Sequence, residues 1–272
     1  MSQKKIISLV LSLVLVIAFK SVVGAQTSPI AIENMSKVFG VGVGIYPDYP
    51  GSNNYSVGAA PFGRYQFGKT DRYLELIATE LYANVLNHPF LRLGPAGNYR
   101  FGRDDVDDPV VDKMQKIDDT IELGVVGGVE FIDKTNPRKR FIALAEFLHD
   151  VAGGYDGYVV SVYARFWYPL IKAVDLTLGA ATTYGSGSYM STYFGVSPSD
   201  SQRSGLPVYD AGSGIRGFRI TPGVVIHFSY NWHLGVGLLY QRLVSNAADS
   251  PVVADRGSAN QFITGLGLAY SW

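Results

Sequence analysis

The sequence predicts an all-β fold, a transmembrane antiparallel up-and-down β-barrel of twelve strands, and three observations predict it. Several segments of about 10–13 residues alternate between bulky apolar residues and small or polar ones, the period of a strand with two unlike faces. These segments exceed the ~5–6 residues typical of globular strands and match the ~9–11 that a tilted membrane strand needs. Aromatic residues end the apolar faces, where the headgroup region of a bilayer favours them.

The composition excludes several classes of protein. The chain has 272 residues, with 23 Lys+Arg balanced by 23 Asp+Glu. A formal charge of zero argues against a basic nucleic-acid-binding protein, so no nucleic-acid partner is expected. The absence of cysteine excludes disulfides, thiolate catalysis and the usual cysteine-based zinc sites.

The N-terminus has the form of an export signal. Lys4 and Lys5 precede an apolar run over 6–19, and Val23-Gly24-Ala25 supplies the small residues of a cleavage site. The run is shorter than the ~20 residues of a spanning helix. We therefore expect a signal peptide over 1–25 and one barrel domain over 26–272, with an uncleaved anchor as the alternative.

The first half of the barrel begins where apolar residues alternate with Gly40, Gly42 and Gly44. These glycines leave one face of the strand without side chains. Such a face is more typical of close packing by backbone or by inward aromatic side chains than of a nucleotide-binding loop. Neighbouring strands of an up-and-down barrel run in opposite directions. Two short strands around residue 80 are therefore required, because with only one strand there two consecutive strands would run in the same direction. If the segment 73–86 is irregular and forms no pair of strands, the barrel has ten strands. The expected strands are 37–46, 55–67, 73–79, 81–86, 91–102 and 119–132.

The second half follows from the lengths of the connections. Bacterial barrels have short periplasmic turns and longer external loops, and the chain supplies both in alternation. The longest connection, 185–216, is therefore external, and so are 104–118 and 244–259. The expected strands are 141–150, 157–168, 174–184, 217–228, 232–243 and 260–272.

Charged residues recur on the face opposite the apolar one, which points into the barrel. They either line a pore or pair across the lumen and fill it, because buried charges persist only when paired or hydrated. The bulky inward Tyr163 and Trp167 favour partial filling. The candidate lumen charges are Arg92, Arg100, Glu122, Glu130, Glu146, Arg165, Asp175 and Arg219.

Other candidate chemistry is weak, and we predict no enzyme, no cofactor, no catalytic residue and no metal site. The acidic run Asp104-Asp105-x-Asp107-Asp108, with Asp112, could hold Ca²⁺ through its carboxylates, but it lacks the glycine and the terminal glutamate of an EF-hand loop. A solvated loop that shares divalent ions with lipopolysaccharide is the preferred interpretation. His149-Asp150, with Glu146 nearby, is the one suggestive arrangement for a barrel hydrolase.

Ordered motifs in the external loops carry a resemblance. They begin with the run Tyr46-Pro47-Asp48-Tyr49-Pro50-Gly51 and continue through the longest loop to a proline-containing run near the C-terminus. The chain resembles the MipA/OmpV family of outer-membrane proteins over essentially its whole mature length. The later motif residues are Tyr189, Tyr193, Phe194, Gly195, Gly205, Leu206, Pro207, Tyr209, Asp249, Ser250 and Pro251.

This resemblance implies a non-enzymatic barrel in the outer membrane, surrounded by lipid and lipopolysaccharide. Within the family, one member is regarded as a scaffold that joins a murein lytic transglycosylase to a penicillin-binding protein. The resemblance therefore implies an envelope scaffold linked to peptidoglycan remodelling, with these two periplasmic enzymes as partners. A narrow pore for small hydrophilic solutes and a surface adhesin are the alternatives.

Overall fold

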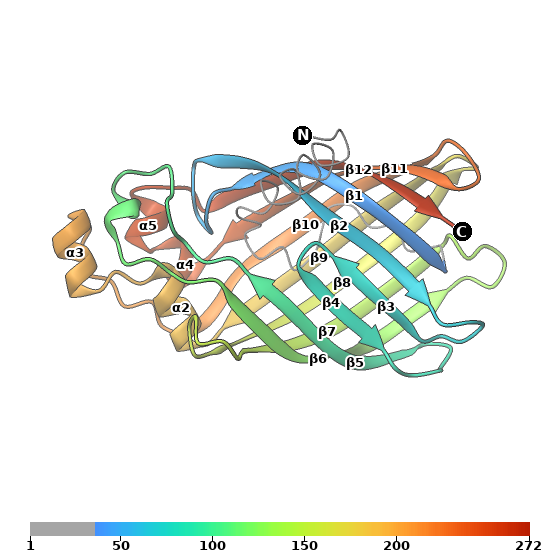
Figure 1. The fold of residues 1–272 in the computed structure, drawn as a ribbon, viewed down its shortest axis with the longest axis horizontal. Helices are drawn as coiled ribbons and strands as arrows, with labels where there is room; N and C mark the ends of the chain where they lie inside the picture. Colours follow the sequence, from blue (N-terminus) through green and yellow to red (C-terminus); the bar gives the residue numbers. More distant parts are fainter. Residues whose placement is uncertain (1–35) are drawn as a thin grey trace, which may run out of the picture.

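The computed structural model describes residues 36–272, so the predicted signal peptide lies outside the described residues. Strands are the main elements of the described chain (Figure 1). They are β1 (Lys37–Pro47), β2 (Tyr55–Gln66), β3 (Tyr73–Ile77), β4 (Glu80–Asn84), β5 (Leu91–Arg100), β6 (Thr120–Ile132), β7 (Arg140–Asp150), β8 (Tyr158–Ile171), β9 (Val174–Gly185), β10 (Gly214–His227), β11 (Trp232–Leu243) and β12 (Asn260–Ser271).

These strands form one closed antiparallel barrel in which each strand pairs with its neighbours in sequence. β1 closes the cylinder against β12, in register from Val38 opposite Ser271 to Ile45 opposite Thr264. Closure leaves no free sheet edge at this seam, as a membrane-embedded sheet requires. The prediction of twelve strands is confirmed, and the ten-strand alternative is wrong.

Side chains alternate between the lumen and the outer surface along each strand. In β5, Leu91, Leu93 and Tyr99 are exposed on the outside, whereas Arg92 and Arg100 are buried inside. A wall that is apolar outside and polar inside suits lipid contact. The alternation predicted from the sequence is therefore present in the structure.

The inward glycines of β1 make room for a ring. A Cβ atom at Gly40 would lie 2.7 Å from Cε2 of Phe62 on β2 and would also meet the backbone oxygen of Leu268 on β12. Phe62 is buried against Val38 and Ala269 beside the β1–β12 seam. An inward aromatic side chain thus covers bare strand, as the alternation with glycine indicated.

Short helices and loops cover one end of the barrel, on the left in Figure 1, while the C-terminus lies at the other end. Because short turns are periplasmic in bacterial barrels, the helical end is external. None of the helices among residues 36–272 is long and apolar enough to cross a membrane. The helices are a 3₁₀ turn, η1 (Val111–Lys113), and α2 (Gly187–Phe194), α3 (Pro198–Ser204), α4 (Ser245–Ala248) and α5 (Pro251–Ala254).

Several expected boundaries differ from the structure, most of all at β8 and β10. β8 continues to Ile171, because only Lys172 and Ala173 are needed to turn into β9. β10 begins at Gly214, because Gly214 and Ile215 pair with the end of β9 before the register shifts. The longest external loop is therefore shorter than the expected 185–216.

Candidate functional site

The periplasmic half of the lumen is organised around Glu130 on β6. This carboxylate is fully buried and lies 2.5 Å from Nε of Arg92 and 3.8 Å from Nη2 of Arg64. Arg140 on β7 also pairs with it, and Arg64 reaches Glu75 at 3.3 Å. A carboxylate that faces three guanidinium groups is a buried ionic network rather than a surface pair, so each member depends on the others.

Aromatic rings support these arginines. The guanidinium of Arg64 lies 3.6 Å from the centroid of the Tyr73 ring. Arg140 and Arg165 lie 5.9 and 5.2 Å from the Trp167 ring. Such contacts stabilise cations that have left bulk water, and the fully buried Trp167 occupies part of the lumen.

A second network lies around Glu122, toward the external end. Arg100 donates from Nε and Nη2 to the two oxygens of this carboxylate, at 2.6 and 3.0 Å. Asn98 donates to it at 2.7 Å, and the hydroxyl of Tyr155 donates at 2.5 Å. Tyr155 belongs to the β7–β8 loop, so this network joins the barrel wall to an external loop. Burial, followed by the charge of Glu122, raises the pKa of Tyr155 well above its ordinary value, so this hydroxyl remains a donor.

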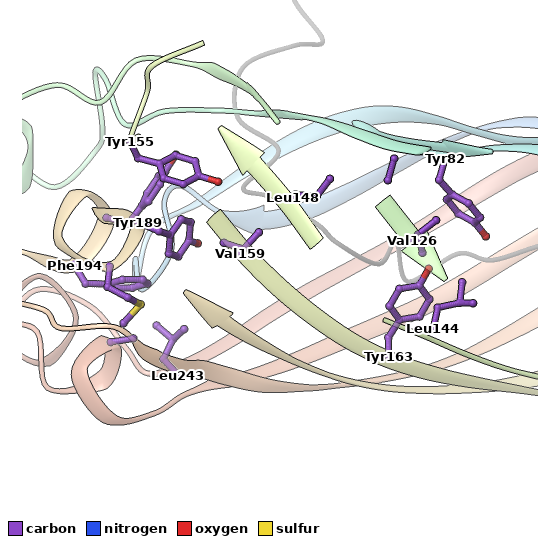
Figure 2. Packing of buried hydrophobic residues seen from close by; sticks show 14 of the residues in the cluster. Tyr82, Val126, Leu144, Leu148, Tyr155, Val159, Tyr163, Tyr189, Phe194 and Leu243 are labelled. Atoms are coloured by element: carbon purple, nitrogen blue, oxygen red, sulfur yellow. The ribbon is translucent and has the colours of Figure 1, made fainter. Parts of the chain in front are cut away.

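Between these networks the lumen holds two further acids and an arginine. Glu80 on β4 and Glu146 on β7 hydrogen-bond to each other across the barrel, near Arg219 on β10. Arg219 donates to the Thr183 hydroxyl at 3.3 Å. Tyr163 lies within electrostatic reach of both acids, and Figure 2 shows Tyr163 and Tyr82 inside the barrel. Polar contacts and aromatic rings therefore occupy the same cross-section.

All the lumen charges named from the sequence are buried, with exposed fractions from 0% to 5%. The structure joins Arg92 with Glu130 and Arg100 with Glu122, and it places Glu146 near Arg219. Asp175 lies apart, at the periplasmic rim. Sequence reasoning missed Arg64, Glu75, Glu80 and Arg140. The alternation of inward and outward residues along their strands could have indicated Arg64, Glu75 and Arg140.

A chain of hydrogen bonds ties the periplasmic ends of four strands together. Arg138 donates to Asp175, with its Nε 2.9 Å from the carboxylate, and Nε2 of His227 lies 2.8 Å from the same carboxylate. Nδ1 of His227 lies 2.8 Å from Nδ1 of His233, and Nε2 of His233 lies 3.0 Å from the Ser271 hydroxyl. These polar atoms bond to one another, so the chain fastens β9, β10, β11 and β12 at the rim.

The exposed charges of the periplasmic rim outside this chain are basic, and Tyr230 is its most exposed aromatic residue. Tyr230, in the β10–β11 turn, is 94% exposed. The carboxylates of the neighbouring turns, Asp71 and Asp133, are half-buried. The exposed cations of the rim are Lys69, Arg72, Lys134, Lys139 and Lys172.

The structure does not assemble the hydrolase arrangement suggested by the sequence. Glu146 and Asp150 are buried on the inner face of β7, whereas His149 points outward. Nδ1 of His149 contacts the backbone oxygen of Asp150 at 2.6 Å rather than a carboxylate. Neither acid therefore orients His149 as a general base.

The acidic external loop is organised by hydrogen bonds and ion pairs. Asp108 accepts N–H bonds from Val110 and Val111 at 2.9 Å and pairs with Arg256 at 2.9 Å. Burial favours a higher pKa for Asp108, but the Val111 N–H and Arg256 outweigh it and hold the pKa below its ordinary value. Asp104 pairs with Lys116. Within residues 36–272 no cluster of three or more His, Asp or Glu side chains has a geometry suited to a metal ion.

The first loop motif packs against two later motifs. Tyr49 is buried in an apolar cluster with Leu206 of the longest loop and Val252 of α5. Gly51 has a φ of +99° and donates its N–H to Gln261 at 3.1 Å. The hydroxyl of Ser250 donates to the backbone oxygen of Phe194 at 2.6 Å. The motif segments therefore form one cap, in which burial raises the pKa of Tyr49 to about 12.

The longest loop also closes the external mouth of the barrel. Tyr189, Tyr193 and Phe194 of α2 are buried with Leu243 in the largest apolar cluster. Figure 2 shows Tyr189, Phe194 and Tyr155 gathered at this end. Gly195 ends α2, and Gly205, with a φ of +79°, ends α3. The remaining motif residues extend the same cap: Tyr46, Pro47, Asp48, Pro50, Pro207, Tyr209, Asp249 and Pro251.

Comparison with known proteins places this fold and these loops in context. The family model for MltA-interacting protein MipA matches residues 39–272. The outer membrane protein Omp26La of Vibrio anguillarum is 30% identical over 160 residues, which cover 58% of this chain and 56% of the relative. The match thus spans little more than half the length of this curated relative.

Solved structures show a likeness of fold. The NanC porin aligns with a TM-score of 0.50 and 9% identity, covering 86% of this chain and 100% of the porin. An outer membrane channel from Pseudomonas putida F1 aligns with a TM-score of 0.45 and 12% identity, covering 90% of this chain and 98% of the channel. The chain is thus an outer-membrane β-barrel, and its expected location in the outer membrane is confirmed.

Proposed function

Because the chain belongs to the MipA family, we propose that it is a non-enzymatic scaffold that docks a periplasmic murein-remodelling enzyme at its periplasmic rim. The observation that carries this proposal is the exposed Tyr230 on a rim whose exposed charges are basic. Exposed aromatic residues are typical anchors of protein interfaces, and clustered charge steers a partner of opposite sign. The partner would therefore present an acidic face to the rim.

The state of the lumen supports this role over that of a pore. Charges that line a water-filled channel are exposed to water, whereas the lumen charges named above are at most 5% exposed. Arg92 pairs with Glu130 and Arg100 with Glu122 instead, and α2 covers the external mouth. A barrel filled in this way acts through the surfaces at its two ends.

The family description supplies the candidate partner, a lytic transglycosylase of the MltA type. A second partner, a penicillin-binding protein, would join the assembly through that enzyme or through the same rim. Both enzymes act on murein, which lies on the periplasmic side. The basic rim is the part of the barrel that faces them.

Binding of the refolded barrel to the purified transglycosylase of the same organism tests the proposal. We expect Tyr230→Ala to weaken binding at least tenfold, because aromatic anchors dominate interface energy. Rising salt should weaken the wild-type complex, because charge contributes to association. Val208→Ala, at an exposed position of the external end, is the matched control and should bind like the wild type. The absence of micromolar binding, or equal binding by Tyr230→Ala, would refute rim docking.

A further inference from the structure

The external cap contains a cleft of about 580 Å³ that is separate from the periplasmic rim. Its walls come from the acidic loop, the β7–β8 loop and several parts of the longest loop, which contains α2 and α3. In the sequence these segments lie far apart, and only closure of the cap brings them together. A volume of this size falls within the range of small-molecule sites, roughly 300–1,000 Å³.

Arg103 lines this cleft and is an unusual cation. Its side chain is buried, with 6% exposure. Its guanidinium lies 6.0 Å from the centroid of the Tyr49 ring. The one side-chain hydrogen bond that it makes within residues 36–272 runs from Nη1 to the backbone oxygen of Tyr193, at a long 3.4 Å. No carboxylate of the described chain lies within ion-pair distance of Arg103. Asp200, the one acid with an electrostatic influence on it, bonds to Arg203 and to the N–H of Gln115. Burial lowers the pKa of Arg103, consistent with a guanidinium that lacks a full partner.

The rest of the lining limits what such a guanidinium would bind. Ser191, Thr192 and Gln115 offer hydroxyl and amide groups, and Asp118 and Asp210 offer exposed carboxylates. The two carboxylates repel a bare anion, but they can accept hydrogen bonds from a polyol. Tyr209 and Val208 add an apolar surface on which the C–H face of a sugar ring can lie.

We propose that this cleft binds an acidic saccharide, with the anionic group of the sugar on Arg103 and its hydroxyls on the surrounding polar side chains. A fork of N–H donors matches a planar carboxylate or a phosphate. The anion would act as the counter-charge that the described chain does not supply to Arg103. The saccharide comes either from the lipopolysaccharide of the same membrane or from outside the cell, since both contain anionic sugars.

Titration calorimetry of the refolded, lipopolysaccharide-free barrel in detergent tests this site. The probes are methyl β-D-glucuronide and glucose 6-phosphate, with methyl β-D-glucoside as the neutral match. We expect saturable binding of at least one acidic probe, and binding of the neutral glucoside at least tenfold weaker. No saturable binding of either acidic probe, or equal binding of the glucoside, would overturn the proposal.

Variants connect the binding to the cleft. Arg103→Gln should weaken binding of the acidic probe at least tenfold, while Arg242→Gln, an exposed arginine outside the cleft, should not alter it. Because Arg103→Gln could disturb the cap, Val208→Trp provides a second variant that fills the cleft from an exposed position. Heat-modifiable migration in gels verifies that each variant is folded. If both folded variants retain wild-type affinity, the proposal is wrong.

Competition distinguishes the two sources of the sugar. If the membrane's own glycolipid is the ligand, added lipopolysaccharide should displace the acidic probe, and lipid A alone, which lacks the acidic core sugars, should displace it less. If the ligand is an external saccharide, neither form should displace the probe. Both results require that Arg103 binds the anionic group. The first identifies the ligand as lipopolysaccharide of the same membrane, and the second as a saccharide from outside the cell.

Discussion

At the scale of single residues, Glu130 is the carboxylate on which the periplasmic half of the lumen depends. It faces Arg92, Arg64 and Arg140 from a fully buried position. Glu130→Gln would leave three guanidinium groups without their common counter-charge, and breaking a buried pair typically costs about 3–5 kcal/mol. We expect a loss of that size in urea unfolding of the detergent-folded barrel. Asp104→Asn, in an exposed pair with Lys116, is the control and should leave the urea midpoint unchanged. Equal effects of the two substitutions would contradict the buried network.

Asp108 gives the external cap a dependence on pH. Its pKa is lowered in the folded cap, so the open cap binds protons more readily. The stabilisation is complete above the ordinary aspartate pKa of about 3.9 and is lost as the pH falls through the lower folded value. We expect limited proteolysis of the acidic loop to increase below about pH 4 and to be constant between pH 5 and 8. Asp108→Asn should reduce the acid-dependent step, and an unchanged step in this variant would rule out Asp108 as its source.

At the scale of elements, glycine determines how closely β1 and β2 pack. A methyl group at Gly40 would meet Phe62 and the backbone of β12 beside the closing seam. Overpacking of this kind costs about 1–3 kcal/mol, so Gly40→Ala should lower the unfolding free energy by that amount. Gly187→Ala, where the added methyl group has open space, should be nearly neutral. A Gly40→Ala barrel as stable as the Gly187→Ala barrel would show that the seam tolerates the methyl group.

The alternation of residues, together with the lengths of the connections, was sufficient to predict the long strands but not every boundary. Each strand shows its period locally, because lipid and lumen impose opposite chemistry on its two faces. The ends of β8 and β10 depend on pairing with β9, which residues distant in sequence provide. The short β3 and β4 were predicted from the alternation of ascending and descending strands rather than from their own pattern, and the structure pairs them as a hairpin.

At the scale of the whole molecule, the sequence indicates which charges point inward but not which of them meet. The alternation of inward and outward residues is a property of one strand. Contacts across the lumen depend instead on the tilt and stagger of the strands, which all the strands set together. The sequence therefore identified Glu130 but not its partners Arg64 and Arg140, which come from β2 and β7. The cap is similar: the loop motifs were evident, but their assembly around Tyr49 and Val252 required the closed barrel.

The whole barrel is expected to be a filled cylinder that acts through its ends, and its conductance tests this most directly. The refolded wild-type protein, inserted into a planar lipid bilayer, should give no steady single-channel current, because paired charges and aromatic rings occupy the lumen beneath α2. Reproducible current steps of fixed size, altered by Glu130→Gln or Arg100→Gln, would demonstrate an open aqueous path through the lumen and contradict the filled barrel.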